Sequence, residues 1–194
     1  MAGRKEGMAE IVLIRHGQTE WSAAGRHTSY TDLELTAEGE RQARAAGERL
    51  AGRKFAAVIS SPRKRALRTA ELAGLQVTEV TEDLAEWNYG EYEGITTATI
   101  RESDPSWSLW TDGAPGGESP EQVAARIDRV LARATELLAE GDVALVAHGH
   151  SLRVTGARWI GLPASGGGKL ALGTATLSTL GFEHGNQVID SWNA

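Results

Sequence analysis

The sequence predicts an α/β fold in which helices cover both faces of a mostly parallel sheet. Short apolar runs at 11–14, 55–59 and 142–147 have the length and composition of buried strands. Longer stretches with helical spacing lie between these runs, and the clearest of them spans 119–141. Such alternation of strands and helices is typical of βα units, which build parallel sheets.

The first half of the chain contains two strand–helix units. The strand expected at 11–14 leads to a helix that Thr36 caps and that runs to about Leu50, rich in Ala, Glu and Arg. The strand at 55–59 is followed by Ser61-Pro62. This pair predicts a helix start, because serine caps the first turn and proline suits the first helical position.

The strongest helix signal opens the second half. Ser119 and Gln122 have the spacing of a capping box. The apolar residues that follow repeat with helical period on one face, and Gly141 closes the helix. These apolar residues are Val123, Ile127, Val130, Leu131, Ala134, Leu137 and Leu138.

The remaining elements complete the sheet and one of its layers. After the strand at 142–147, a further helix is expected over 151–161, ahead of Pro163. Apolar stretches at 174–180 and 187–189 predict an antiparallel pair at one edge of the sheet.

Two segments do not fit the alternation. Residues 83–118 hold three tryptophans, several glycines and little periodicity, so we expect an insert or lid on the substrate side. Residues 1–10 are polar and are expected to form a flexible extension. We therefore predict a single domain over 11–194.

Composition excludes several classes of function. The chain has no cysteine, which excludes disulfides, thiolate zinc sites and cysteine nucleophiles, and favours a reducing compartment such as the cytoplasm. A net charge of −6 disfavours nucleic-acid binding, which depends on neutralising phosphates. The first apolar run, 11–14, is too short for a signal segment or a membrane span, so no membrane partner is expected.

Basic residues follow the predicted strands at the point where each strand ends. His16 comes after the first strand and His148 after the strand at 142–147, while Arg65 lies early in the helix after the second strand. Because ligands of open α/β sheets bind beyond the carboxyl ends of the strands, we expect these side chains at one rim. The basic run around Arg65 fits either an anion site or a solvated helix face.

His16 is the candidate nucleophile at this rim. A neutral imidazole attacks phosphorus if a backbone carbonyl holds its other nitrogen as N–H, and neighbouring Arg15 can grip phosphate oxygens. Taken alone, this tripeptide also fits a structural histidine. His148 is expected to be a cationic partner of His16 on the phosphoryl group.

Two other readings of the late histidines remain open. His148 and His150 could ligate a metal together with His16, although no further ligand cluster has suitable spacing. The run from Gly149 through Ser151 is close to a nucleophile elbow, but Arg153 stands where the final glycine should be.

Glu86 is the candidate proton donor. A phosphatase needs an acid for the departing alkoxide and then a base for water, and one carboxyl group can serve both steps. Glu86 lies among aromatic residues, but Asp83, Glu91 and Glu93 are competitors that spacing alone does not exclude.

Three motifs in this order resemble those of the histidine phosphatase superfamily, also called phosphoglycerate mutase-like. They are Arg15-His16-Gly17-Gln18-Thr19-Glu20, Ser61-Pro62-Arg63-Lys64-Arg65 and His148-Gly149. The resemblance runs from about Ile11 to the C-terminus and implies that family's three-layer α/β/α sandwich. It implies a phosphorylated nucleophile at His16, a proton donor at Glu86 and a phosphate pocket completed by Arg15, Arg65 and His148, with no metal or cofactor.

Finer features are similar to the sedoheptulose-1,7-bisphosphatase-type branch of this superfamily, above all the run 86–94 and the segment 147–153. This likeness implies a sugar-phosphate substrate. It also implies a set of substrate-binding candidates, namely Gln18, Ser22, His27, Thr28, Trp87, Tyr89, Arg126, Gly149 and His150.

The chain departs from the expected patterns at two places. Ser22 stands where many mutase-like members of the superfamily carry asparagine. Ser29-Tyr30 replaces an expected Gly-Arg, which removes a candidate grip on a second phosphate. We expect a phosphatase acting on a small-molecule phosphoester. The alternatives are a mutase, which needs segments that close the site and is usually longer, and a noncatalytic phosphate-ligand binder; a homo-oligomer is left open.

Overall fold

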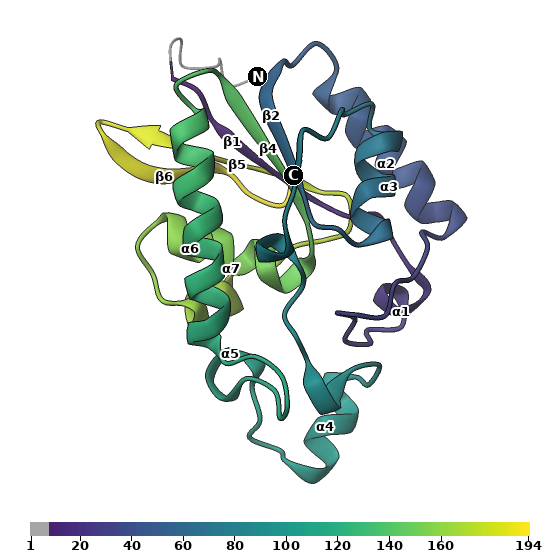
Figure 1. Cartoon of the computed structure of the whole chain (residues 1–194). Helices are drawn as coiled ribbons and strands as arrows, with labels where there is room; N and C mark the ends of the chain where they lie inside the picture. The colour runs from purple at the N-terminus through teal and green to yellow at the C-terminus, as the bar shows by residue number, and fades with distance from the viewer. Residues whose placement is uncertain (1–7) are drawn as a thin grey trace.

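A six-stranded sheet forms the centre of the computed structural model, which describes residues 8–194 (Figure 1). The strand order is β3-β2-β4-β1-β5-β6. The first four strands in this order are parallel, and β5 and β6 are antiparallel additions at one edge. The bounds are β1 Ile11–Arg15, β2 Phe55–Ser60, β3 Glu79–Val80, β4 Asp142–Ala147, β5 Leu177–Glu183 and β6 Asn186–Ser191.

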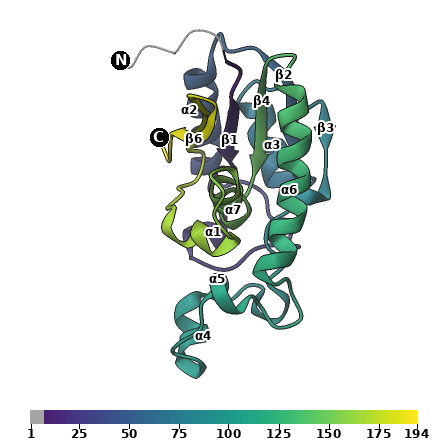
Figure 2. The same cartoon turned by 90° about the vertical axis from the view of Figure 1, so that its left-hand side faces the viewer.

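Helices cover both faces of the sheet, as expected. Helices α2 and α3 lie on one face and α6 and α7 on the other (Figures 1 and 2). The α-helices are α1 Glu20–Ala23, α2 Ala37–Leu50, α3 Lys64–Leu72, α4 Thr97–Ser103, α5 Leu109–Asp112, α6 Pro120–Leu137 and α7 Gly149–Trp159. Short 3₁₀ turns span η1 Glu82–Leu84, η2 Gly90–Tyr92 and η3 Ala164–Lys169.

The central strands are buried on both faces, which explains why they are continuous apolar runs. Alternate residues of a strand point to opposite faces. In β1, Ile11 and Leu13 enter the core under α6 and α7, whereas Val12 and Ile14 enter the core under α2 and α3. One short sequence therefore supports both cores and holds His16 rigidly at its end.

Most predicted elements are confirmed. Thr36 caps α2 through Gly39, and Ser119 and Gln122 form the predicted capping box at the start of α6. The stretches predicted at 174–180 and 187–189 pair as β5 and β6.

The prediction that Ser61 caps α3 is wrong. This helix begins at Lys64 with Arg63 at the N-cap position. The Ser61 hydroxyl instead accepts the Arg63 backbone N–H at 3.3 Å and bonds His148 Nε2 at 2.7 Å. The serine side chain is therefore committed to a tertiary contact that local sequence does not reveal.

Helix α7 begins at Gly149, two residues earlier than predicted. The reason lies far away in sequence, because the Glu86 carboxylate accepts the backbone N–H groups of His150 and Ser151 at 3.0 and 2.9 Å. An acidic side chain from another segment thus satisfies the helix terminus. The two-residue strand β3 and the short helices α1, α4 and α5 were not predicted.

The segment predicted as an insert, 83–118, forms the part of the molecule beyond the carboxyl ends of β1 and β4 (Figure 1). The expected extension at 1–10 falls largely outside the described residues. Glu10, the last residue of this range, makes two contacts: its backbone N–H donates to Asp142 Oδ1 at 3.0 Å, and its carboxylate pairs with Arg53 at 2.6 Å. Among residues 8–194, no helix is both long and apolar enough to cross a membrane.

Candidate active site

The two histidines predicted to meet at the sheet rim do so. His16 follows β1 and His148 follows β4, and these strands pair in register up to Arg15 and Ala147. The two imidazole rings lie with centroids 5.2 Å apart at 62°. Both side chains are buried, at 5% and 0% exposure.

One nitrogen of His16 is fixed and the other is free. Nδ1 lies 2.7 Å from the carbonyl oxygen of Gly17. A carbonyl only accepts, so Nδ1 carries the proton and Nε2 carries the lone pair of the neutral ring. Burial, followed by the charges of Arg65 and Arg15, holds the pKa of His16 well below its ordinary value. The ring is therefore neutral and nucleophilic at neutral pH.

Close backbone packing fixes the loop that carries His16. A Cβ on Gly17 would come within 2.3 Å of the Gly39 carbonyl oxygen, and one on Gly39 within 2.0 Å of the Gln18 oxygen. The Gly17 N–H also donates to Thr69 Oγ1 at 3.0 Å. Glycine is required at both positions because backbone meets backbone there.

Arg65 and Arg15 bring cationic groups to the same place. The Arg65 side chain is fully buried, and its Nη atoms donate to the carbonyls of Thr28, Ser29 and Thr31 at 3.1–3.2 Å. Arg15 donates through Nη1 to the carbonyl of Leu172. Both guanidinium groups are thus held by backbone oxygens and keep further N–H groups unspent.

Several buried polar atoms on the described residues of this region have no hydrogen-bond partner. Within residues 8–194, five buried side-chain polar atoms have no hydrogen-bond partner, and they belong to residues of this region: Arg15 Nε, His27 Nδ1, Arg63 Nε, Arg65 Nε and His148 Nδ1. Buried polar groups are normally paired, so such a concentration indicates a site for an anionic ligand.

His148 differs from the expectation in its charge. Burial, followed by the charges of Arg65 and His16, holds its pKa well below the ordinary value, so His148 is neutral in the free protein rather than cationic. If the Ser61 hydroxyl donates to Nε2, Nδ1 carries the N–H and can donate to a ligand. A phosphate dianion beside the ring would favour protonation.

Glu86 is fixed on the other side of the site. Its Oε1 accepts the N–H groups of Trp87 and Ser151 at 2.8 and 2.9 Å, and its Oε2 accepts that of His150 at 3.0 Å. The side chain is 7% exposed. Burial lowers the pKa of Arg15 and Arg65, and the negative charge of Glu86 raises both pKa values in part. The carboxylate therefore lies near both guanidinium groups.

Aromatic side chains line the region beyond Glu86. His27 stacks on Tyr89 with ring centroids 4.7 Å apart, and the Tyr89 hydroxyl shares a 2.5 Å hydrogen bond with His150 Nδ1. Trp110 packs edge-on against His150, with ring centroids 5.3 Å apart. The Arg153 guanidinium lies over the Trp110 ring, 4.5 Å from its centroid. This wall brings together three of the predicted substrate-binding residues.

The other substrate-binding candidates have varied surroundings. Gln18 and Ser22 lie in the loop and short helix after His16, where Ser22 caps the turn by bonding Thr19. The carbonyl of Thr28 holds Arg65, and Gly149 lies against the Arg15 guanidinium.

Trp87 is fully buried and donates to the carbonyl of Glu118. Arg126 is engaged entirely by protein groups, so its contacts support a role other than substrate binding. As a substrate contact it stays a prediction.

Sequence reasoning missed several neighbours of the site. Ser61 was assigned to a helix cap, and Trp107 and Trp110 lie in a segment without periodicity. Of the basic run, only Arg65 turns fully inward. Lys64 pairs with Glu34, and Arg68 with Glu40 and Glu71, so the solvated-face interpretation fits those two residues.

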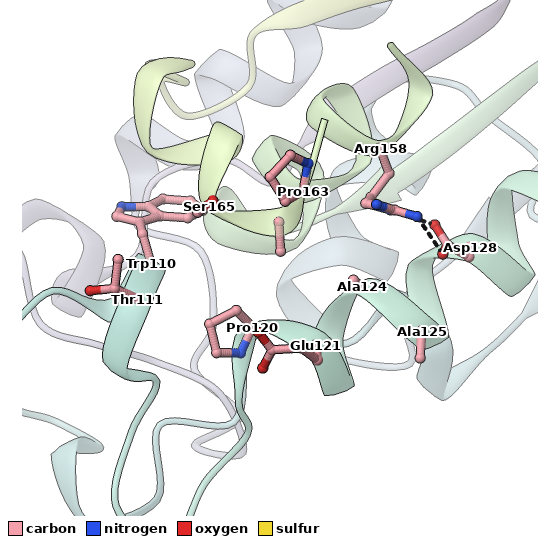
Figure 3. A pocket seen from close by; sticks show the side chains of 11 residues that line it. Trp110, Thr111, Pro120, Glu121, Ala124, Ala125, Asp128, Arg158, Pro163 and Ser165 are labelled. Atoms are coloured by element: carbon pink, nitrogen blue, oxygen red, sulfur yellow. Dashed lines mark hydrogen bonds and ion pairs between the residues drawn. The ribbon is translucent and has the colours of Figure 1, made fainter. Parts of the chain in front are cut away.

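A separate hollow of about 460 Å³ lies between α5, α6 and η3 (Figure 3). It is lined in part by the Asp128–Arg158 ion pair, which closes at 2.8 Å. The remaining lining side chains are Trp110, Thr111, Pro120, Glu121, Ala124, Ala125, Pro163, Ala164 and Ser165. None of the predicted catalytic residues faces it.

The described residues, 8–194, contain no group of three or more His, Cys, Asp or Glu side chains arranged to hold a metal ion. His150 Nδ1 instead bonds the Tyr89 hydroxyl. The geometry thus offers an anion site made of guanidinium and imidazole groups.

Acid should destabilise this fold through its buried histidines. The pKa values of His16, His148 and His150 lie well below the ordinary 6.5, chiefly because burial disfavours the charged ring. Below pH 6.5 the unfolded chain therefore binds protons that the folded chain does not. The neutral histidines make their full contribution to the free energy of unfolding above pH 6.5. Below pH 6.5, each histidine lowers this free energy by up to about 1.4 kcal/mol per pH unit.

Urea unfolding at pH 7.5 and 5.5 measures this effect. We expect a lower free energy of unfolding at pH 5.5, and a smaller drop in a His150→Gln variant. A free energy that stays constant or rises on acidification would contradict the neutral state of the buried histidines.

Comparison with known proteins agrees with this arrangement. The family model described as histidine phosphatase superfamily (branch 1) matches residues 11–194. An acid phosphatase of Mycobacterium tuberculosis is 50% identical over 177 residues, covering 90% of this chain and 87% of that protein. The sedoheptulose 1,7-bisphosphatase of Saccharomyces cerevisiae is 37% identical over 182 residues, covering 78% of this chain and 67% of the yeast protein.

A solved structure from Mycobacterium tuberculosis has the same fold. It superposes with a TM-score of 0.93 at 48% sequence identity, covering 95% of this chain and 97% of the mycobacterial chain. The predicted three-layer α/β architecture is therefore confirmed both by the sheet and helices of this chain and by this likeness.

Proposed function

Since this chain belongs to the histidine phosphatase superfamily, branch 1, we propose that it is a phosphatase that hydrolyses small phosphoesters through a phosphohistidine at His16. The preferred substrates are sugar phosphates. The proposed mechanism uses no metal and no cofactor. The lack of cysteine supports a cytoplasmic location.

One observation carries this proposal. A neutral, buried imidazole with a free Nε2 lies near buried nitrogens of Arg15, Arg65 and His148 that have no hydrogen-bond partner among the described residues. A phosphoryl group has a phosphorus for the nucleophile and equatorial oxygens for the donors. The site therefore matches the charge and shape of the group to be transferred.

The first step forms the phosphoenzyme. Nε2 of His16 attacks phosphorus in line, an N–P bond forms, and the bond from phosphorus to the ester oxygen breaks. Glu86 gives its proton to the departing oxygen, so an alcohol leaves. Arg15, Arg65 and His148 stabilise the negative charge on the phosphoryl oxygens.

The second step regenerates the enzyme. Water attacks the phosphorus of phosphohistidine while the Glu86 carboxylate takes a proton from it. The N–P bond breaks, its electron pair returns to Nε2, and inorganic phosphate leaves. Glu86 is again protonated, and His16 is again neutral with its proton on Nδ1.

The aromatic wall supports a substrate with a sugar-sized leaving group. Aromatic rings and polar hydroxyl and imidazole groups lie together beyond Glu86, and this mixed composition suits a sugar, which has apolar faces and polar edges. The likeness to a yeast bisphosphatase supports the same class. Hydrolysis is preferred over mutase chemistry because the relatives at 50% and 37% identity are named as phosphatases.

Phosphate release from a panel of compounds tests this function. With EDTA present, we expect turnover of sugar monophosphates or bisphosphates to exceed that of p-nitrophenyl phosphate and 3-phosphoglycerate. Interconversion of 2- and 3-phosphoglycerate without phosphate release would favour the mutase alternative. No reaction with any compound would favour a phosphate-ligand binder.

A further inference from the structure

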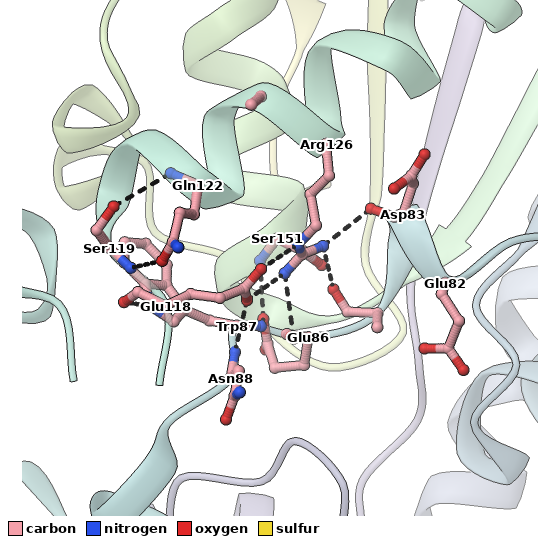
Figure 4. Close-up of polar contacts among 12 residues, drawn as sticks. Glu82, Asp83, Glu86, Trp87, Asn88, Glu118, Ser119, Gln122, Arg126 and Ser151 are labelled. Carbon is pink, nitrogen blue, oxygen red and sulfur yellow. Dashed lines mark hydrogen bonds and ion pairs between the residues drawn. The ribbon is translucent and has the colours of Figure 1, made fainter. Parts of the chain in front are cut away.

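Arg126 on α6 spends all of its hydrogen-bonding capacity inside the protein (Figure 4). A guanidinium carries five N–H donors. Those of Arg126 reach the backbone carbonyls of Asp83, Ala85 and Glu86 at 2.9, 2.7 and 3.2 Å. The remaining two form a bidentate pair with the Glu118 carboxylate at 2.7 and 3.0 Å. No donor is left for a substrate.

Glu118 holds the same segment from its other side. Its Oε2 accepts the backbone N–H of Asn88 at 2.8 Å, and its carbonyl accepts the indole N–H of Trp87 at 2.9 Å. Its own N–H donates to the carbonyl of Asn88. The ion pair therefore grips the chain immediately before and after Glu86, where no regular helix or strand satisfies the backbone.

This grip determines where Glu86 can carry a proton. Each carboxylate oxygen has two lone pairs. Oε1 accepts two backbone N–H groups, from Trp87 and Ser151, whereas Oε2 accepts only that of His150. A proton for the leaving group is therefore carried on Oε2. Its position depends on the backbone at 83–88, which carries Glu86, and on α7, whose His150 N–H it accepts.

We propose that the Arg126–Glu118 ion pair is the positioning device that sets Glu86 Oε2 against the ester oxygen of the substrate. This inference rests on the proposed function and gives Arg126 a role that acts through Glu86. Arg126 and Glu118 are only 10% and 21% exposed, so both charges are largely removed from water. The cost of desolvating a buried ion pair offsets much of its attraction, so stability alone does not explain this pair. Its placement beside Glu86 suggests a role in positioning that residue.

Leaving-group dependence separates positioning from structural support. A proton donor matters for a strongly basic leaving group and little for 4-nitrophenolate, which departs as a stable anion. Phenyl, 4-chlorophenyl and 4-nitrophenyl phosphate have nearly the same shape but leaving groups of falling basicity. Their kcat/KM values report phosphoenzyme formation, the step in which Glu86 acts as an acid.

The test compares Arg126→Lys and Glu118→Gln with Arg129→Gln. Lysine cannot reproduce the planar fork of five donors, and the Glu118→Gln amide loses the charge and one acceptor oxygen. Arg129 is a matched control, because it lies on the same helix and pairs with the Asp83 side chain at 2.5 Å but is 62% exposed. Urea unfolding of each variant gives its folded fraction at the assay temperature.

We expect kcat/KM for phenyl phosphate to fall by roughly 10- to 100-fold in the first two variants, as a displaced general acid predicts. For 4-nitrophenyl phosphate, whose leaving group needs no proton, kcat/KM should fall by less than about 3-fold. The Arg129→Gln variant should stay near wild type with all three substrates. An equal loss of kcat/KM for all three phenyl phosphates would overturn the inference. If one of the two variants unfolds, the other alone gives this test. A wild-type protein inactive on every compound would instead refute the proposed function.

Discussion

Replacement of His16 by alanine is expected to reduce phosphate release by about 10⁶-fold, the scale seen when a covalent nucleophile is removed from a protease. The Gly17 carbonyl holds the proton of His16 on Nδ1, so Nε2 presents its lone pair among the cationic groups of the site. Alanine removes this lone pair and with it the proposed nucleophile. A panel of sugar phosphates with a sensitive phosphate assay measures the loss.

Two variants control for indirect effects of this change. His16→Asn keeps a side-chain amide that can donate to the Gly17 carbonyl but supplies no nucleophile, so it should be as inactive as His16→Ala. His184→Asn changes an exposed histidine in the β5–β6 turn and should leave activity unchanged. Activity of His16→Ala within tenfold of wild type would refute the assignment of the nucleophile.

Replacement of Arg65 by alanine is expected to lower kcat by about 10²–10³-fold, the cost of losing one preorganised donor to the transition state. It should also destabilise the fold. The fully buried guanidinium satisfies the carbonyls of Thr28, Ser29 and Thr31, and each unsatisfied carbonyl costs about 1–3 kcal/mol. Steady-state kinetics and urea unfolding measure the two losses separately.

Lys64→Ala provides the comparison for Arg65→Ala. Lys64 lies in the same helical turn and carries the same charge, but it is 60% exposed and pairs with Glu34 at 3.4 Å. We expect its removal to change kcat by less than about twofold, because exposed charges interact weakly through water. Equal losses in the two variants would show that the net charge of the turn matters, and would contradict the specific role of Arg65.

The fold could be predicted largely from the sequence because its parallel strands are short apolar runs between periodic helices. In β1, Ile11 to Ile14 serve two cores at once, and this leaves a recognisable run of four apolar residues. The convergence of His16 and His148 also followed from chain order, since both residues end parallel strands. The family resemblance is confirmed by the match over residues 11–194.

Long-range contacts at the site could not be predicted from local patterns. Ser61 has the sequence context of a helix cap, yet its hydroxyl serves His148, which is 87 residues away. The start of α7 depends on a carboxylate from Glu86, 64 residues before His150. Arg126 sits on the apolar-periodic helix α6, and nothing in that periodicity shows that its donors fix the chain around Glu86.

The structure of the segment 83–118 could not be predicted for a related reason. Its helices are short, and buried tryptophans hold it through their indole N–H groups rather than through a periodic apolar face. Trp107 donates to the Gly113 carbonyl at 3.0 Å and Trp87 to that of Glu118 at 2.9 Å. Its role as a lid stays a prediction, whereas its aromatic contacts with His27 and His150 are observed.

Trapping of the covalent intermediate tests the central claim most directly. The protein is mixed with a ³²P-labelled sugar phosphate, quenched in alkali, which preserves phosphohistidine, and digested for peptide mapping. We predict label on the peptide that contains His16, lost on brief acid treatment and absent from His16→Asn. Turnover without label on His16, or label on a different residue such as Ser151, would contradict the proposed mechanism.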